Sequence, residues 1–137
     1  MGLKLIIEED GKVLVEVPLS PGDWHRRELM REVERLRRDV RRNVEFYEAF
    51  TNANRVRMLH RLLEREDHTL SFTELMTELE LNPKIVRENA VKLQNIGFIE
   101  SPSRGAYRLS RRGQICFMMS VVAMQRMLQL MEEAWNE

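Results

Sequence analysis

The stretch that decides the fold lies in the second half of the chain, where residues 73–100 read TELMTELELNPKIVRENAVKLQNIGFIE. Thr73 is a typical N-cap for a short helix that ends before Leu81-Asn82-Pro83. Asn begins turns, and Pro fixes the first turn of the helix that follows. Residues 84–96 have apolar side chains at helical spacing, and Gly97 is a typical helix end. The sequence predicts two short helices joined by a tight turn.

A strand, a turn and a second strand follow these helices. The predicted strands are residues 98–100 and 106–109, and Pro102 and Gly105 shape the turn between them. Two helices followed by such a hairpin make a winged helix-turn-helix. In this fold the second helix fits the major groove of DNA, and the first helix braces it across the backbone.

The predicted reading helix, residues 84–96, has one apolar side formed by Val86, Ala90, Leu93 and Ile96. Its other side carries Lys84, Arg87, Glu88, Val91, Lys92 and Asn95. Arg can bind guanine O6 and N7 together, and Glu can accept a hydrogen bond from cytosine N4. With the wing at 101–106 and the start of the last helix, the expected DNA-binding residues are Asn82, Lys84, Arg87, Glu88, Lys92, Ser103, Arg104, Arg108, Arg111 and Arg112.

The charge distribution agrees with this expectation. The chain has 22 basic and 22 acidic residues, which argues against a simple polycation. Residues 84–113, however, carry seven Lys and Arg against two Glu. A basic region in a neutral protein is typical of a face that meets a polyanion. The alternative is a chance fluctuation of a solvated surface.

The residues before this core predict two further elements. Residues 3–17 alternate apolar and other side chains around Asp10-Gly11, which is typical of a β-hairpin. Residues 20–47 predict a long helix capped by Ser20, with a narrow apolar seam of the coiled-coil kind that includes Leu29, Val33, Leu36 and Val40. We expect this seam to contact a partner chain; the alternative is packing within its own domain.

The remaining segments complete the predicted architecture. Residues 49–66 predict an amphipathic helix and residues 70–72 a short strand. Residues 110–135 predict a last helix, capped by Ser110 and apolar almost all round up to Met124, which a second subunit would cover. The expected dimer contacts are Leu29, Val33, Leu36, Val40, Met118, Met119, Val122 and Met127.

The predicted fold class is therefore mainly α with small β-hairpins. Its expected parts are an N-terminal hairpin and long helix at 1–48, a winged helix-turn-helix at 49–113, and a C-terminal dimerisation helix at 114–137.

Several other classes of protein are disfavoured. A single cysteine cannot form an internal disulfide framework, and no secretory or membrane-spanning segment is evident, so a cytoplasmic location is expected. We find no phosphate-binding loop, nucleophile motif or paired carboxylates, so no catalytic residue, cofactor or enzymatic activity is expected. His25, His60, His68 and Cys116 lack metal-ligand spacing, so no metal site is expected.

The central part of the chain resembles the ArsR-type winged-helix repressors, and its end is also similar to MarR-type regulators. The resemblance covers residues 49–113 and rests on Ala49-Phe50, RVRML at 55–59, TEL at 73–75, LNP at 81–83, Val86, LQNIGFIE at 93–100 and YRLSRRG at 107–113. It implies dimeric DNA binding, often released by a metal or a small molecule. Metal-sensing members have two cysteines before the second helix, where this chain has Ser71 and Thr73.

The predicted function is sequence-specific binding of double-stranded DNA by a homodimeric transcriptional regulator, with repression expected. An unidentified small-molecule effector is compatible with this function. Two alternatives stay open at this point. One is a winged-helix module that docks other proteins in a transcription or replication assembly, and the other is an architectural DNA binder of low specificity.

Overall fold

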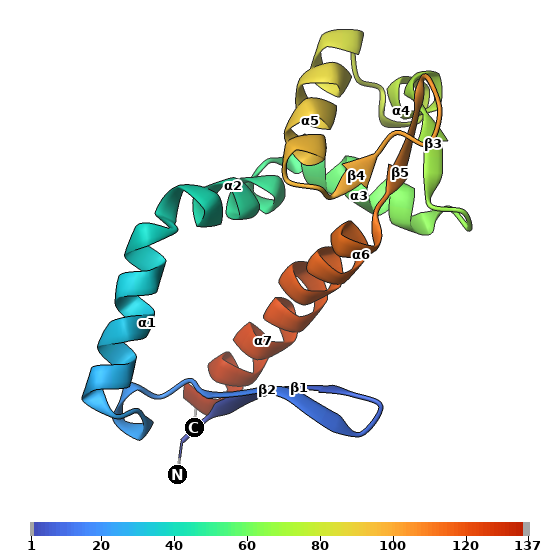
Figure 1. The fold of residues 1–137 in the computed structure, drawn as a ribbon. Helices are drawn as coiled ribbons and strands as arrows, with labels where there is room; N and C mark the ends of the chain where they lie inside the picture. The colour runs from blue at the N-terminus through green and yellow to red at the C-terminus, as the bar shows by residue number, and fades with distance from the viewer. Residues whose placement is uncertain (1, 136–137) are drawn as a thin grey trace. The chain divides into compact units, whose positions relative to one another are not determined.

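The structure is a computed structural model that describes residues 2–135, and its backbone contacts divide the chain into two compact units. The first unit is Met1–Asn43 and the second is Val44–Glu137 (Figure 1). The second unit contains the winged helix-turn-helix, and the first contains the N-terminal hairpin and a helix. The predicted fold class, mainly helical with small antiparallel hairpins, is confirmed.

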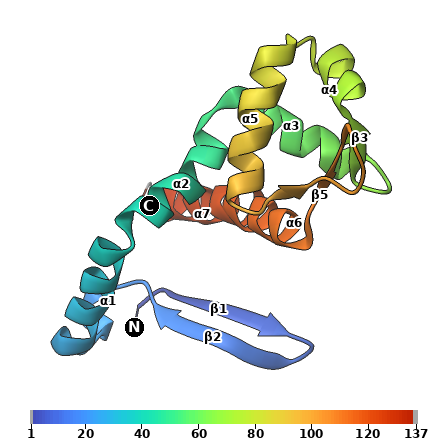
Figure 2. The same ribbon diagram turned by 45° about the horizontal axis from the view of Figure 1, so that its top comes forward.

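The first unit begins with the predicted hairpin. Strands β1 (Lys4–Glu9) and β2 (Lys12–Pro18) pair antiparallel, and Figure 2 shows them as a long two-stranded ribbon. Asp10 and Gly11 both have positive φ, 50° and 81°, as a two-residue turn of type I′ requires. The register shifts between Ile7 and Glu8, because β2 carries one extra residue there, which forms a β-bulge.

The helix predicted over residues 20–47 is wrong in its bounds and its continuity. Ser20 precedes only a short 3₁₀ turn, η1 (Pro21–Asp23), and makes no side-chain cap. Trp24 then leaves the helical region, and its Nε1 donates to Pro18 O at 2.9 Å. Two helices follow, α1 (Arg26–Arg38) and α2 (Val40–Thr51), separated at Asp39. No residue of 2–43 is buried, so local propensity decides where these helices end, and Asp is a poor former of helix interiors.

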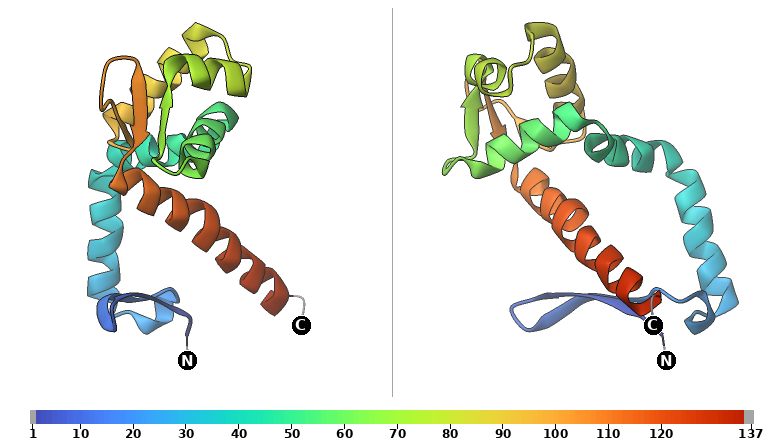
Figure 3. Two further views of the ribbon diagram at one scale, coloured as in Figure 1. Left: turned by 90° about the vertical axis from the view of Figure 1, so that its right-hand side faces the viewer. Right: turned by 180° about the vertical axis from the view of Figure 1, so that it is seen from behind.

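The second unit has the predicted order of elements. After α2 come α3 (Ala53–Glu64), β3 (Thr69–Ser71), α4 (Phe72–Leu79), α5 (Pro83–Asn95), β4 (Ile99–Glu100) and β5 (Ala106–Leu109). The three strands form an antiparallel sheet in the order β3-β5-β4. The chain continues as α6 (Arg111–Phe117), a π-helical segment η2 (Met118–Ala123) and α7 (Met124–Trp135), which Figure 3 shows as one rod leading away from the sheet.

Three predicted boundaries in this unit are wrong, because the residues that cap the helices are not the predicted ones. Asn52 caps α3, accepting hydrogen bonds from the amides of residues 54 and 55, so residues 49–51 belong to α2. Ser71, rather than Thr73, caps α4 through a capping box with Glu74. Phe72 is therefore the first residue of α4 and not part of the strand.

The core of the second unit contains side chains from helices α2 to α6 and from the three strands of the sheet. Its buried apolar residues are Ala49, Met58, Leu59, Leu62, Leu70, Leu75, Leu79, Val86, Ala90, Leu93, Phe98, Ile99, Leu109 and Phe117. Phe98 connects α2 to this core, because the rings of Phe46 and Phe50 both lie 5.6 Å from its ring. Gly113 lets α6 approach the backbone of Phe98 closely, since a Cβ at this position would collide with the Phe98 carbonyl oxygen.

The last helical rod leaves much apolar surface uncovered by its own chain. Ser110 caps α6 as predicted, accepting from the Gly113 amide at 2.9 Å. Over residues 118–134 the rod is half-buried or exposed, and Met118 and Met119 are 47% and 49% exposed. The expectation that a second subunit covers this helix stays a prediction.

Candidate nucleic-acid interface

Three residues determine the conformation of the turn between α4 and α5. Glu80 ends α4 in the left-handed conformation, with φ 54°. Asn82 then caps α5, its Oδ1 accepting from the Ile85 amide at 2.9 Å, and Pro83 occupies the first helical position. The Asn82 side-chain oxygen is thus used by the fold, which leaves its NH₂ group as the exposed donor.

Helix α5 turns the predicted apolar side inward and the predicted polar side outward. Val86, Ala90 and Leu93 are at most 1% exposed. The exposed residues are those expected for DNA contact together with their neighbours: Lys84, Arg87, Glu88, Val91, Lys92 and Asn95. Lys84 Nζ lies 3.9 Å from Glu88 Oε1 in a largely exposed pair, so solvent screens much of this attraction.

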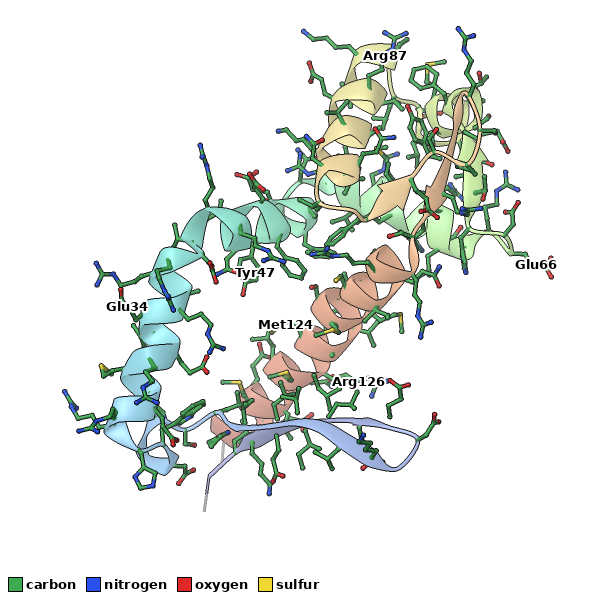
Figure 4. All side chains as sticks on the ribbon, viewed as in Figure 1. Glu34, Tyr47, Glu66, Arg87, Met124 and Arg126 are labelled. Carbon is green, nitrogen blue, oxygen red and sulfur yellow. The ribbon has the colours of Figure 1, made fainter. Side chains whose placement is uncertain are left out.

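Arg87 is held by a contact that sequence reasoning missed. Its guanidinium carbon lies 5.2 Å from the centre of the Phe72 ring, at the start of α4. Such a cation–π contact restricts the arginine while leaving its donors free. Figure 4 shows Arg87 on the N-terminal part of α5, directed away from the core. No sequence pattern indicated this contact, because it depends on how α4 and α5 cross.

The wing turn is connected to Phe72 as well. The Phe72 amide donates to the Gly105 carbonyl at 2.8 Å, and Ser101 Oγ donates to Ala106 O at 2.8 Å across the turn. Ser103 and Arg104 are exposed at its tip. Phe72 therefore joins the N-terminal part of α5 to the wing, and Figure 1 shows both at the end of the unit that bears α4.

The other predicted cations are placed differently. Arg108 lies opposite Glu100 in the β4–β5 ladder and pairs with it at 2.9 Å, so its charge is partly neutralised. Arg112 lies against Gly97, at the C-terminal end of α5, about 20 Å along the helix from Lys84. Arg111 is exposed beside it at the start of α6. The structure thus places Lys84, Arg87, Ser103 and Arg104 near the N-terminal end of α5. It places Arg111 and Arg112 near the C-terminal end of the same helix.

Arg112 also affects the thiol of Cys116, which lies on the same helix, α6. Burial raises the pKa of the Cys116 thiol, and the positive charge of Arg112 opposes this rise. Arg112 is itself exposed at the surface of the second unit.

A buried polar pair behind α5 was also missed. Arg55 and Asn89 are only 6% and 7% exposed. Arg55 donates to Asn89 Oδ1 at 3.1 Å and to the Glu48 carbonyl through Nε at 3.0 Å and Nη2 at 2.7 Å. The pair joins α2, α3 and α5. Its signal in the sequence was the inward position of residue 89, three residues after Val86 and four before Leu93.

A small cavity adjoins this pair. It has a volume of about 180 Å³ and is lined by Glu45, Glu48, Ala49, Arg55, Lys92, Asn95 and Ile96. Its walls come from α2, α3 and the C-terminal end of α5. Among residues 2–135, no group of three or more His, Cys, Asp or Glu is placed to share a metal ion. No helix in that range is long and apolar enough to cross a membrane.

Comparison with known proteins agrees with this fold. One similar solved structure is Sco5413, a MarR-family transcriptional regulator from Streptomyces coelicolor, with a TM-score of 0.50 and 14% identity over 80% of this chain and 78% of that one. Another is RHA00566, an ArsR-family transcriptional regulator, with a TM-score of 0.45 and 14% identity over 68% of this chain and 89% of that one. No protein-family model and no curated protein sequence matches the chain.

The match to the MarR-family structure supports the winged helix-turn-helix fold for this chain. At this identity the likeness concerns the fold, and the function is argued from the site itself.

Proposed function

We propose that this protein is a homodimeric transcriptional regulator that binds double-stranded DNA with sequence specificity. Residues 84–96 enter the major groove, and the wing at 101–106 contacts the adjacent backbone or minor groove. The observation that carries the proposal is the exposed, basic N-terminal part of α5, where Arg87 lies over Phe72 at 5.2 Å and Phe72 bonds the wing turn. A rigid cationic helix end beside a short wing suits a groove and its flanking phosphates.

The first test is selection of bound fragments from genomic DNA with the purified full chain, followed by footprinting. A symmetric dimer is expected to protect two half-sites about 10 base pairs apart or a multiple of this. A uniform footprint with equal affinity for random duplexes would instead support an architectural binder. Repression is the role we propose, because a dimer that occupies a promoter excludes other proteins.

The salt dependence of binding tests the electrostatic part. Lys92 lies further along α5 and is proposed to contact phosphate rather than a base edge. We expect Lys92→Ala to weaken binding to all duplexes alike and to lower the slope of log K against log salt by about 2 per dimer. An unchanged slope would remove Lys92 from the interface.

Dimerisation is proposed from uncovered apolar surface in each unit. In the first unit, Leu36 and Val40 are each 53% exposed, with Val33 on the same seam and Leu29 half-buried. In the second unit, the rod exposes Met118, Met119 and Val122, with Met127 half-buried. Continuous exposed apolar surface of this kind is typical of subunit interfaces.

Sedimentation of the full chain tests the dimer. Leu36→Glu and Met119→Glu each place a charge on the proposed interface and are expected to shift the protein toward monomer. Arg31→Glu changes an exposed residue on another side of α1 and is the matched control. A wild-type protein that sediments as a monomer at micromolar concentration would contradict the proposal.

An effector site is proposed at the cavity beside α5. Its lining mixes Arg55 and Lys92 with Glu45 and Glu48, so it suits a small polar molecule that carries both donors and acceptors. A ligand there would contact α2 and the end of α5 together, and could therefore change the position of the reading helix. A thermal-shift screen with Lys92→Glu and Glu45→Lys as comparison variants would identify such a molecule.

A second function is favoured by two acidic residues that lie beside residues proposed to bind DNA. Glu88 lies 3.9 Å from Lys84, and Glu100 pairs with Arg108. A face that carries both charges can dock a protein, as winged helices in transcription or replication assemblies do. Absence of duplex binding at low salt, with a defined partner bound through Glu88, would favour this function over the first.

A further inference from the structure

Both outer edges of the N-terminal hairpin are unpaired in the described part of the chain. Among residues 2–135, β1 and β2 form a sheet of two strands only. A hairpin with two open edges is marginally stable by itself and is a template for further strands.

The backbone direction along β1 follows from one hydrogen bond. The Leu19 amide donates to the Leu3 carbonyl at 2.8 Å, and the register continues with Leu5 opposite Val17. Because inward and outward groups alternate along a strand, odd-numbered residues of β1 face β2. The amides and carbonyls of Lys4, Ile6 and Glu8 therefore point to the open edge.

The two edges of the hairpin differ in how open they are. The outer edge of β2 is interrupted by the extra residue near Leu14 and ends in Pro18, which has no amide hydrogen. A bulge and a proline are both features that block edge pairing. Strand β1 has neither, and Ile6 at its centre is 47% exposed.

The sequence of β1 is complementary to itself in one register. When two copies pair antiparallel about Ile6, Lys4 of each strand lies opposite Glu8 of the other, and Leu5 lies opposite Ile7. The residues that exchange hydrogen bonds between the two copies are then the even-numbered ones, whose amides and carbonyls point to the open edge of β1. Centring the pair on residue 4 or 8 would instead oppose two lysines or two glutamates, which is destabilising.

We propose that β1 pairs with β1 of a second copy about Ile6, joining the two hairpins into one four-stranded sheet. The proposal rests on the homodimer proposed above and assigns the hairpin a role in it. The pairing is isologous, as a two-fold axis requires. It also brings the apolar faces that carry residues 3, 5 and 7 of the two hairpins side by side.

Disulfide trapping in the full chain tests this pairing directly. In a Cys116→Ser background, Ile6→Cys places two thiols on residues whose Cα atoms would lie about 5.5 Å apart, within the range of a disulfide. Leu14→Cys is the matched control, because residue 14 is 52% exposed on the other strand. We expect Ile6→Cys to form a covalent dimer about tenfold faster than Leu14→Cys, given this proximity. Equal rates would overturn the proposal.

Charge exchange gives an independent readout. Lys4→Glu alone and Glu8→Lys alone each place like charges at both ends of the paired strands, so each is expected to weaken self-association about tenfold. A mixture of the two variants restores opposite charges at both ends and should form mixed dimers in preference to either homodimer, although the Lys4→Glu chain still lacks the ion pair between Lys4 and Glu16 of its own hairpin. No preference for the mixed dimer would also overturn the proposal.

The outcomes separate this inference from the function on which it rests. If the protein is dimeric and binds duplex, but Ile6→Cys traps no faster than Leu14→Cys, only the strand pairing is wrong. If the wild-type chain is monomeric and binds no duplex, the proposed function is wrong, and the pairing is wrong with it.

Discussion

The guanidinium of Arg55 donates a hydrogen bond to Asn89 at 3.1 Å inside the second unit, between the start of α3 and the middle of α5. Asn89 in turn donates to the Ile85 carbonyl at 2.8 Å. Since Arg55 also binds the Glu48 carbonyl, three helices share one buried polar network. Helix α5 is thereby fixed relative to the last turn of α2.

Asn89→Leu is expected to destabilise the protein by about 2–3 kcal/mol, because it leaves a buried arginine donor without its partner. Denaturant unfolding of the full chain measures this loss. Asn95→Leu, on the exposed side of the same helix, should cost less than about 0.5 kcal/mol. Combining Asn89→Leu with Arg55→Met should cost less than the sum of the two single changes, and strict additivity would show that the two side chains do not interact.

Phe72→Leu is expected to reduce duplex affinity about two- to fivefold, because Arg87 loses the ring that restricts it. The fold should survive, since the substituted side chain is similar in volume. Phe50→Leu is the control. It removes another ring of the same unit, and this ring lies against Phe98 rather than against Arg87. Equal affinity losses in the two variants would show a general packing effect. Fluorescence anisotropy with a selected duplex is the measurement.

Gly113→Ala is expected to destabilise the second unit by about 2–4 kcal/mol, because the added methyl group collides with the backbone carbonyl of Phe98. Thermal unfolding should show the loss clearly. Gly22→Ala has open space around the added carbon and should leave the midpoint unchanged. A stable Gly113→Ala protein would mean that α6 lies further from β4 than the structure places it.

The pKa of Glu74 is lowered by hydrogen bonds from the Ser71 backbone and side chain. A carboxylate with a lowered folded-state pKa stabilises the fold above its unfolded pKa, and this contribution is lost as the pH falls through the folded value. NMR titration should find Glu74 below its ordinary pKa of 4.5 and, in Ser71→Ala, closer to it. Loss of this cap should also cost about 1 kcal/mol at neutral pH.

The sequence predicted those parts of the fold that local chemistry determines. The Asp10-Gly11 turn, the Asn82-Pro83 start of α5 and Gly97 with φ 78° all lie where the residue types indicated. The inward side of α5 was predicted from spacing alone, apart from Asn89. Such features need only a few neighbouring residues, and the energies involved do not depend on the rest of the chain.

The features that sequence reasoning missed depend on contacts between distant residues. The Arg87–Phe72 contact and the Arg55–Asn89 pair join residues 15 and 34 positions apart. The separation of Arg111 and Arg112 from Lys84 depends on the length of α5, which sequence proximity to the wing does not reveal. The break at Asp39 occurs where no packing reinforces the helix, so a continuous apolar seam was a poor guide there.

The most direct test of the central proposal is the affinity of Arg87→Ala for a selected duplex and for a scrambled one. We expect about a tenfold or greater loss on the selected duplex and a much smaller loss on the scrambled one, because a base contact carries specificity and a phosphate contact does not. Arg61→Ala removes the same charge from a residue paired with Glu64 and should change neither affinity appreciably. Unchanged binding of the selected duplex by Arg87→Ala would contradict the assignment of α5 as the reading helix.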